Sequence, residues 1–154
     1  MVDQHVTPDG ASGLAAYPFK ELVNSRQGLV YHSQFVVTDD DLPRVLSLLA
    51  THASDAGYFT HHEARLEFGG SVIELVTNSV VLLQTLDAMR LRPPAPWLAF
   101  PDIDAGAIGS LQGSLDYWWN WLWMPYWNSA SPEEREQLLA QASDDWREFF
   151  EFHV

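Results

Sequence analysis

The chain of 154 residues contains no cysteine, and this lack removes several classes of function at once. It excludes disulfide bonds, thiolate metal sites and a cysteine nucleophile. The first ten residues contain neither a basic segment nor an apolar run, so we expect no signal peptide. Together these features predict a cytoplasmic protein, because a reducing compartment has no use for disulfides.

Basic residues are scarce. Lys20 is the only lysine, and 8 basic side chains face 21 acidic ones, which gives a net charge of −13. From Asp102 onward the chain has ten carboxylates but only Arg135 and Arg147. Such a surface repels nucleic acid and anionic membranes and favours basic partners. We therefore expect neither direct nucleic-acid binding nor membrane binding.

The chain also lacks the common catalytic motifs. It has no Gly-x-Ser-x-Gly, no phosphate-binding loop and no His-Glu-x-x-His. His61 and His62 invite a metal interpretation, but adjacent residues of a strand point to opposite faces. Asp102 and Asp104 lack the rest of a calcium loop. The sequence predicts no catalytic residue, metal site or cofactor, and it leaves the question of an enzyme open, with the balance against one.

Long uninterrupted apolar runs are missing too. The stretch 105–127 is long enough to span a membrane, but Asp116 and Asn120 interrupt it. Five of the seven Trp residues lie between Ser114 and Asn128. Placed on a helix from Ile108 to Trp123, the apolar side chains form a broad stripe, which predicts a core helix. Pro125 should end or kink it.

Periodicity in the first half predicts a small sheet. The expected elements are strands at 28–37, 62–68 and 71–77 and a helix from Leu42 to about Ser54. Gly69-Gly70 between the last two strands is a strong hairpin signal. Residues 79–90 fit a helix or a strand equally well. Residues 1–18 read as a loop or a loosely held arm, and 18–25 as one short helical turn.

The C-terminal segment predicts one amphipathic helix. Ser131 is a candidate N-cap, Pro132 suits the first helical position, and Glu134 can close a capping box. Its apolar stripe should pack on the Trp-rich helix. The whole chain is therefore expected to be a single α+β domain, 1–154, with a mainly antiparallel sheet over residues 28–77 that helices cover.

Charge and composition favour an interaction protein. An acidic domain rich in Trp and Tyr suits an inhibitor of a basic partner, such as an immunity protein, an antitoxin or a mimic of nucleic acid. The partner would be a toxin or a nucleic-acid-binding enzyme. The acidic residues expected to bind it are Asp102, Asp104, Asp144, Asp145, Glu148 and Glu151.

An alternative is a small-molecule-binding domain or hydrolase with an aromatic pocket beside the Trp-rich helix. Its lining would be Trp97, Asp116, Tyr117, Asn120, Trp121 and Tyr126. A third hypothesis is a homo-oligomer that buries the Trp-rich helix between subunits. The first hypothesis predicts exposed carboxylates on one face, whereas the second predicts a cavity.

Overall fold

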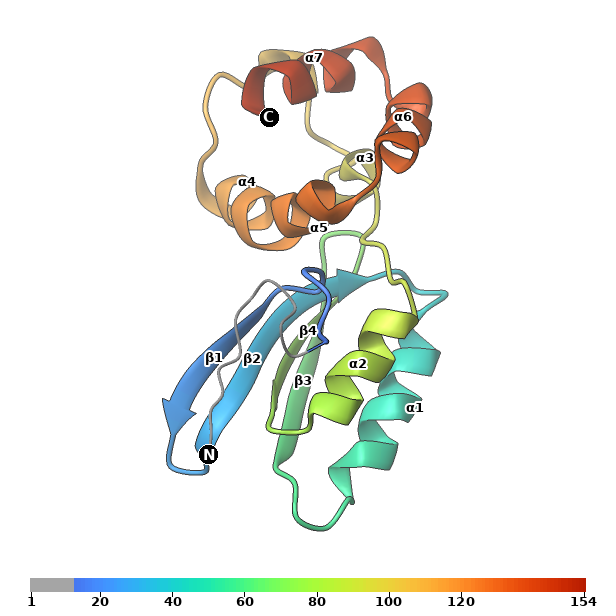
Figure 1. Cartoon of the computed structure of the whole chain (residues 1–154). Coiled ribbons are helices and arrows are strands. Elements are labelled where there is room, and N and C mark those ends of the chain that lie inside the picture. Colours follow the sequence, from blue (N-terminus) through green and yellow to red (C-terminus); the bar gives the residue numbers. More distant parts are fainter. Residues whose placement is uncertain (1–12) are drawn as a thin grey trace.

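A computed structural model describes residues 13–154 and arranges them in two lobes (Figure 1). The sheet lobe contains the strands and two helices, and the helical lobe contains the chain from Pro96 onward. Residues 90–95 link the two lobes. The fold is α+β with an antiparallel sheet, as the sequence predicts. Of the predicted N-terminal loop, 1–12 lie outside the described residues and 13–19 have no regular secondary structure.

Four strands form one sheet in the order β1-β2-β4-β3, with every neighbour antiparallel. They are β1 (Lys20–Ser25), β2 (Gly28–Val37), β3 (Thr60–Glu67) and β4 (Gly70–Thr77). The predicted helical turn at 18–25 is wrong, because this segment pairs with β2 along its whole length. Its strand pattern is hidden because a lysine, Lys20, occupies its buried position.

Two helices, α1 (Leu42–Ala53) and α2 (Val80–Ala88), cover one face of the sheet (Figure 1). The core between them is apolar, with Phe35 and Leu49 fully buried. Residues 79–90, which the sequence leaves undecided, are helical for most of their length. The Ser79 hydroxyl accepts a hydrogen bond from the Leu82 N–H at 3.2 Å and so caps the helix.

The helical lobe is a chain of short helices. They are α3 (Pro96–Ala99), η1 (Ala105–Ala107), α4 (Gly113–Tyr117), η2 (Trp118–Trp123), α5 (Met124–Ser129), α6 (Pro132–Gln141) and α7 (Asp144–His153). The Trp-rich helix thus begins at Gly113 rather than Ile108. It also continues past Pro125. The π-helical segment η2 has a wider turn, in which the Met124 N–H bonds to the Trp119 carbonyl, and this accommodates the proline.

The C-terminal segment forms two helices instead of the predicted one. Ser131 caps α6 as expected, accepting from the Glu134 N–H at 3.1 Å. A second cap, Ser143, accepts from the Trp146 N–H at 3.2 Å and starts α7 in a new direction. The capping box is not completed, since the Glu134 carboxylate faces Tyr126 at 3.4 Å.

Phe68 joins the lobes. It sits at the tip of the β3–β4 hairpin with φ of +59°, and Gly69 beside it also has positive φ. This conformation costs a non-glycine residue about 1–2 kcal/mol. The Phe68 ring is buried against Phe100 and Tyr117, at 5.6 and 6.1 Å between centroids. Burial of such a ring contributes roughly 1.5–3 kcal/mol, which offsets the strain.

Within residues 13–154, no helix is both long and apolar enough to cross a membrane.

Candidate functional site

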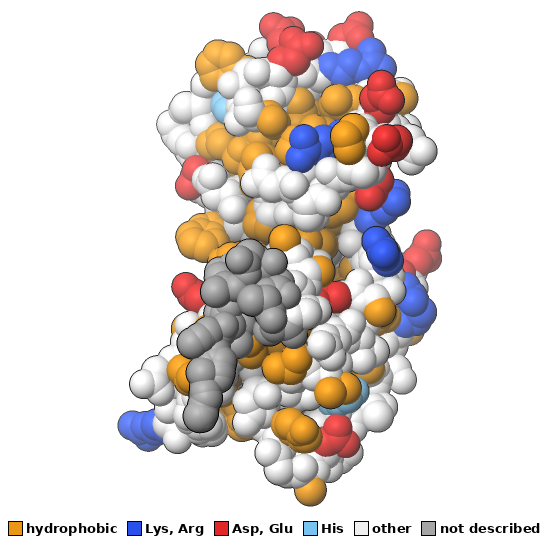
Figure 2. Space-filling view, viewed as in Figure 1, with side chains coloured by type: hydrophobic (Ala, Val, Ile, Leu, Met, Phe, Trp, Pro, Cys, Tyr) orange, Lys and Arg blue, Asp and Glu red, His pale blue; other side chains and the backbone are white. Residues whose placement is uncertain are grey.

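The outer face of α7 carries carboxylates that are not neutralised. Asp145, Glu148 and Glu151 are exposed and form no ion pair with any residue that the structure describes. Asp144 pairs with Arg147 at 3.3 Å. Figure 2 shows acidic side chains gathered at this end of the molecule. Asp145 lies in the first turn, where a carboxylate favours the positive end of the helix, but Glu148 and Glu151 lie beyond that turn and have no such role.

A small pocket opens beside these carboxylates, with a volume of about 170 Å³. Its lining includes Asp145, Glu148 and His153, together with the apolar side chains of Ile108 and Phe149. Phe152 also lines it, although this ring is 76% exposed. A liquid water occupies roughly 30 Å³, so the pocket has room for about five water-sized groups. Acidic and aromatic side chains that line one pocket suit the end of a basic side chain.

The two other predicted acidic residues lie before α7 in the chain. Asp104 caps η1 by accepting a hydrogen bond from the Gly106 N–H at 3.0 Å. Gly106 lies directly against α7, because a Cβ added to it would stand 3.1 Å from the Asp145 carboxylate. Asp102 is exposed in the preceding turn. The structure therefore brings Asp104 to the foot of α7 through η1, next to the pocket.

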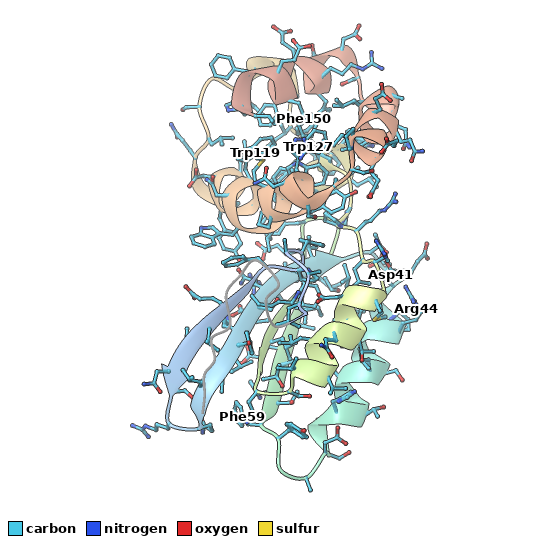
Figure 3. The ribbon with its side chains drawn as sticks, viewed as in Figure 1. Asp41, Arg44, Phe59, Trp119, Trp127 and Phe150 are labelled. Carbon is cyan, nitrogen blue, oxygen red and sulfur yellow. The ribbon has the colours of Figure 1, made fainter. Side chains whose placement is uncertain are left out.

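Most of the tryptophans fill the core of the helical lobe. Trp118 and Trp123 are fully buried and stack at 5.5 Å. Trp119, Trp127 and Phe150 point toward one another between the helices (Figure 3), and the Trp127 and Phe150 rings stack at 4.9 Å. These rings fill the space between the helices, so this part of the Trp-rich helix forms a packed core and not the wall of an open cavity.

The six residues of the predicted aromatic pocket have different surroundings. Trp97 packs against the core, and Trp121 is 59% exposed. The Asn120 amide donates to the Asp116 carboxylate at 2.9 Å on the outside of the helix. Tyr117 and Tyr126 complete the set: the Tyr117 hydroxyl accepts from Arg65 at 3.4 Å, while Tyr126 lines a groove between the lobes.

This interlobe groove is the larger cavity, with a volume of about 520 Å³. Its walls come from the end of α2, the link, α5 and α6. They comprise Ala15, Ala16, Tyr17, Asp87, Ala88, Arg90, Leu91, Arg92, Tyr126, Ser129, Ala130 and Glu134. The Tyr17 and Tyr126 rings meet edge to face at 5.4 Å. Burial raises the pKa of both tyrosines.

The charges that line the groove are balanced, with Asp87 and Glu134 against Arg90 and Arg92. Asp87 is neutralised by the buried ammonium of Lys20 and also accepts from the Ala15 N–H at 2.8 Å. Burial lowers the pKa of Lys20, and its hydrogen bond to Asp87 opposes that shift. Glu134 contacts Arg92 at 3.4 Å. Arg90 has no ion pair with the described residues, so one cationic side chain of the groove stays uncommitted.

Sequence reasoning did not identify the groove arginines. The signal was present in the segment Met89-Arg90-Leu91-Arg92, where two arginines follow a helix in a chain with eight basic residues. What brings them opposite Tyr126 is the packing of α5 and α6 on the link, which no local pattern encodes.

The His61-His62-Glu63 segment lies on the edge strand β3. The His61 ring contacts the Glu63 carboxylate at 3.5 Å, and both side chains are exposed. Among residues 13–154 no group of three His, Cys, Asp or Glu side chains is close enough to hold a metal ion.

Comparison of the chain with family models, with curated proteins and with solved structures finds no match.

Proposed function

We propose that the protein binds a basic protein through the outer face of its helical lobe and inhibits it. The observation that carries this proposal is the set of unpaired carboxylates on α7 beside a small aromatic-walled pocket. Carboxylates that neither pair nor cap are available to a partner. The approach of an opposite charge would relieve the repulsion between them.

Electrostatics makes such a face effective for capture. Complementary charge raises the association rate of two proteins by about 10- to 1,000-fold at low salt. It also rejects acidic partners, since like charges across an interface cost several kcal/mol. An inhibitor of a cationic enzyme benefits from both effects. The proposed partner is a toxin or a nucleic-acid-binding enzyme. The carboxylates of this protein would occupy the surface with which that partner binds phosphate groups.

The α7 pocket supplies the specificity in this proposal. An Arg or Lys side chain of the partner would enter it, with its stem against Phe149 and Phe152 and its charge between Asp145 and Glu148. Such anchored, desolvated cations are frequent hot spots of protein interfaces. Charge on the rest of the face would steer the encounter.

The test is affinity capture from the native cells with three forms of the tagged protein. The first is the wild type. The second is the double variant Asp145→Asn/Glu148→Gln, which removes the pocket's charge. The third, Asp39→Asn/Asp40→Asn, removes the same charge from exposed positions of the sheet lobe. Each capture is washed at low salt and then at high salt.

We expect one basic partner with the wild type and with the sheet-lobe variant, released by salt and lost from the pocket variant. Recovery of that partner by all three forms would place its binding elsewhere. A clean wild-type capture at low salt would contradict the proposal for the proteins of that lysate. A purified complex would then show inhibition when the partner's own activity is assayed with and without the protein.

A further inference from the structure

The groove between the lobes has the size and the walls of a ligand site. Its volume of about 520 Å³ falls in the range of small-molecule pockets, roughly 300–1,000 Å³. One side is formed by the aromatic rings of Tyr17 and Tyr126, with Leu91 and Ala130 as aliphatic neighbours. Figure 2 shows basic side chains along the waist between the two lobes. The groove is separate from the α7 pocket, with which it shares no lining residue.

Charge in the groove is balanced, unlike that of the whole molecule, because Arg90 and Arg92 line it together with Asp87 and Glu134. Lys20 satisfies Asp87, and the 3.4 Å contact between Arg92 and Glu134 is a loose one. The Arg90 backbone N–H donates to the Asp87 carbonyl at 3.2 Å, but its guanidinium has no ion pair or hydrogen bond among the described residues. In a protein of net charge −13, where cations are few, a free guanidinium that lines a cavity is a specific feature.

The backbone at Arg90 strengthens this point. Arg90 directly follows the C-cap of α2 with φ of +54°, a position at which glycine is strongly preferred. An arginine there accepts backbone strain that glycine would avoid. Strain retained at a cavity wall indicates that the side chain has a use at that place.

We propose that the groove binds a small molecule that carries an oxyanion next to an aromatic or other flat apolar group. The Arg90 guanidinium would hold the oxyanion, a carboxylate or a phosphate, in a two-pronged hydrogen bond. Arg92 would supply a second cation if its contact with Glu134 were broken. The rings of Tyr17 and Tyr126 would contact the apolar part. This site is independent of partner binding at α7.

The test is a titration of the full chain, labelled with ¹⁵N, followed by its amide spectrum. Phenyl phosphate and benzoate are the probes, and they distinguish a phosphate site from a carboxylate site. Phenol and inorganic phosphate are the controls for each half of the ligand. The variants are Arg90→Gly, which relieves the backbone, Arg90→Gln, which keeps a polar side chain, and Arg26→Gly, which removes an exposed cation elsewhere.

We expect saturable shifts in residues 88–91 and 126–130 with at least one probe, and weaker effects with both controls. Both Arg90 variants should lower the affinity at least about tenfold, since a charge-assisted pair is lost. The Tm of Arg90→Gly should equal or exceed that of the wild type. Arg26→Gly should bind as the wild type does. The proposal is overturned if neither probe saturates, if either Arg90 variant binds normally, or if Arg26→Gly loses as much affinity.

Discussion

The two lobes use the same kinds of residue in opposite ways. Between residues 13 and 95, nine carboxylates accompany six basic side chains, whereas from residue 96 onward ten carboxylates accompany two. In the sheet lobe, charge is largely paired, as in the buried Lys20–Asp87 bridge and the exposed Arg65–Glu74 bridge. In the helical lobe it is largely free. In the sheet lobe, therefore, most charged side chains contribute to intramolecular ion pairs, whereas in the helical lobe most of them are exposed without an ion pair among the described residues.

Several buried polar groups of the helical lobe have no hydrogen-bond partner within residues 13–154. In the sheet lobe, Lys20, Ser33 and Ser79 each form a side-chain hydrogen bond. In the helical lobe the indole N–H groups of Trp118, Trp123 and Trp127 find no partner among the described residues, and the buried Tyr17 hydroxyl has none either. An unpaired buried donor costs about 1–3 kcal/mol. The helical lobe is therefore held together by the volume and contact of its rings.

The largest effect is expected from truncating those rings. Trp123→Ala should lower the free energy of unfolding by about 3–5 kcal/mol, because Trp123 is fully buried among four other aromatic rings. Phe35→Ala, at a fully buried site of the sheet lobe, is the matched variant. Val36 and Val72 of the sheet belong to the same hydrophobic cluster as the buried tryptophans, so the two lobes share part of their core. Both variants should therefore unfold in a single transition when urea denaturation is followed by far-UV circular dichroism. Two separate transitions would mean that the lobes unfold independently.

The buried bridge of the sheet lobe comes next. Lys20→Met should cost about 3 kcal/mol, since it strands the Asp87 carboxylate, which is 11% exposed. Arg65→Met is the control, because it breaks exposed pairs that contribute about 0–1 kcal/mol. Urea midpoints of the two variants give the comparison. Equal losses would show that pairing in this lobe has no special value when buried.

The hairpin tip measures how strongly the lobes are coupled. Phe68→Asn removes the ring from the helical lobe but supplies a residue that tolerates positive φ. The two effects oppose each other, and we expect a net loss of about 2 kcal/mol. Hydrogen exchange should then rise in α4, whose Tyr117 ring packs on Phe68. A variant as stable as the wild type would mean that Phe68 does not fasten the lobes.

The smallest effect is expected on the pH dependence of stability, through Tyr17 in the groove between the lobes. Burial raises the folded-state pKa of Tyr17, while an unfolded tyrosine ionises near pH 10. The stability that depends on the protonated hydroxyl is thus fully present below about pH 10 and is lost as the pH rises above it. Tyr17→Phe should weaken this alkaline loss, and Tyr58→Phe, at an exposed site, should not. Urea midpoints of both variants at about pH 8 and about pH 11 test this prediction. An unchanged alkaline loss in Tyr17→Phe would show that ionisation of Tyr17 does not cause it.

Local signals in the sequence were sufficient wherever a residue acts on its own neighbours. Gly69 suits the hairpin turn because its φ of +77° is a conformation that glycine adopts without strain. Ser131 is the N-cap of α6 as its sequence suggests. The exposed carboxylates of α7 could also be predicted, since they alternate with an apolar stripe.

Long-range packing explains the misses. Strand β1 was not predicted because its buried position holds a lysine, Lys20, whose burial depends on an ion pair with Asp87, 67 residues away. The π-helical turn before Pro125 depends on rings that the rest of the lobe must enclose. Arg90 and Tyr126 line the same groove only because α5 packs near the link. Each of these features joins segments that are distant in the chain, so no window of sequence contains both halves.

The claim that free charge in the helical lobe serves binding is tested most directly by the rate at which the captured partner associates. We would measure that rate for the wild type, Asp145→Asn/Glu148→Gln and Asp39→Asn/Asp40→Asn at about 50 and about 300 mM salt, where screening is weak and strong. We predict that the α7 variant associates about tenfold more slowly at low salt, and that the sheet-lobe variant stays within about twofold of the wild type. Equal rates for the two variants would contradict the account, because the placement of the charge would then be irrelevant.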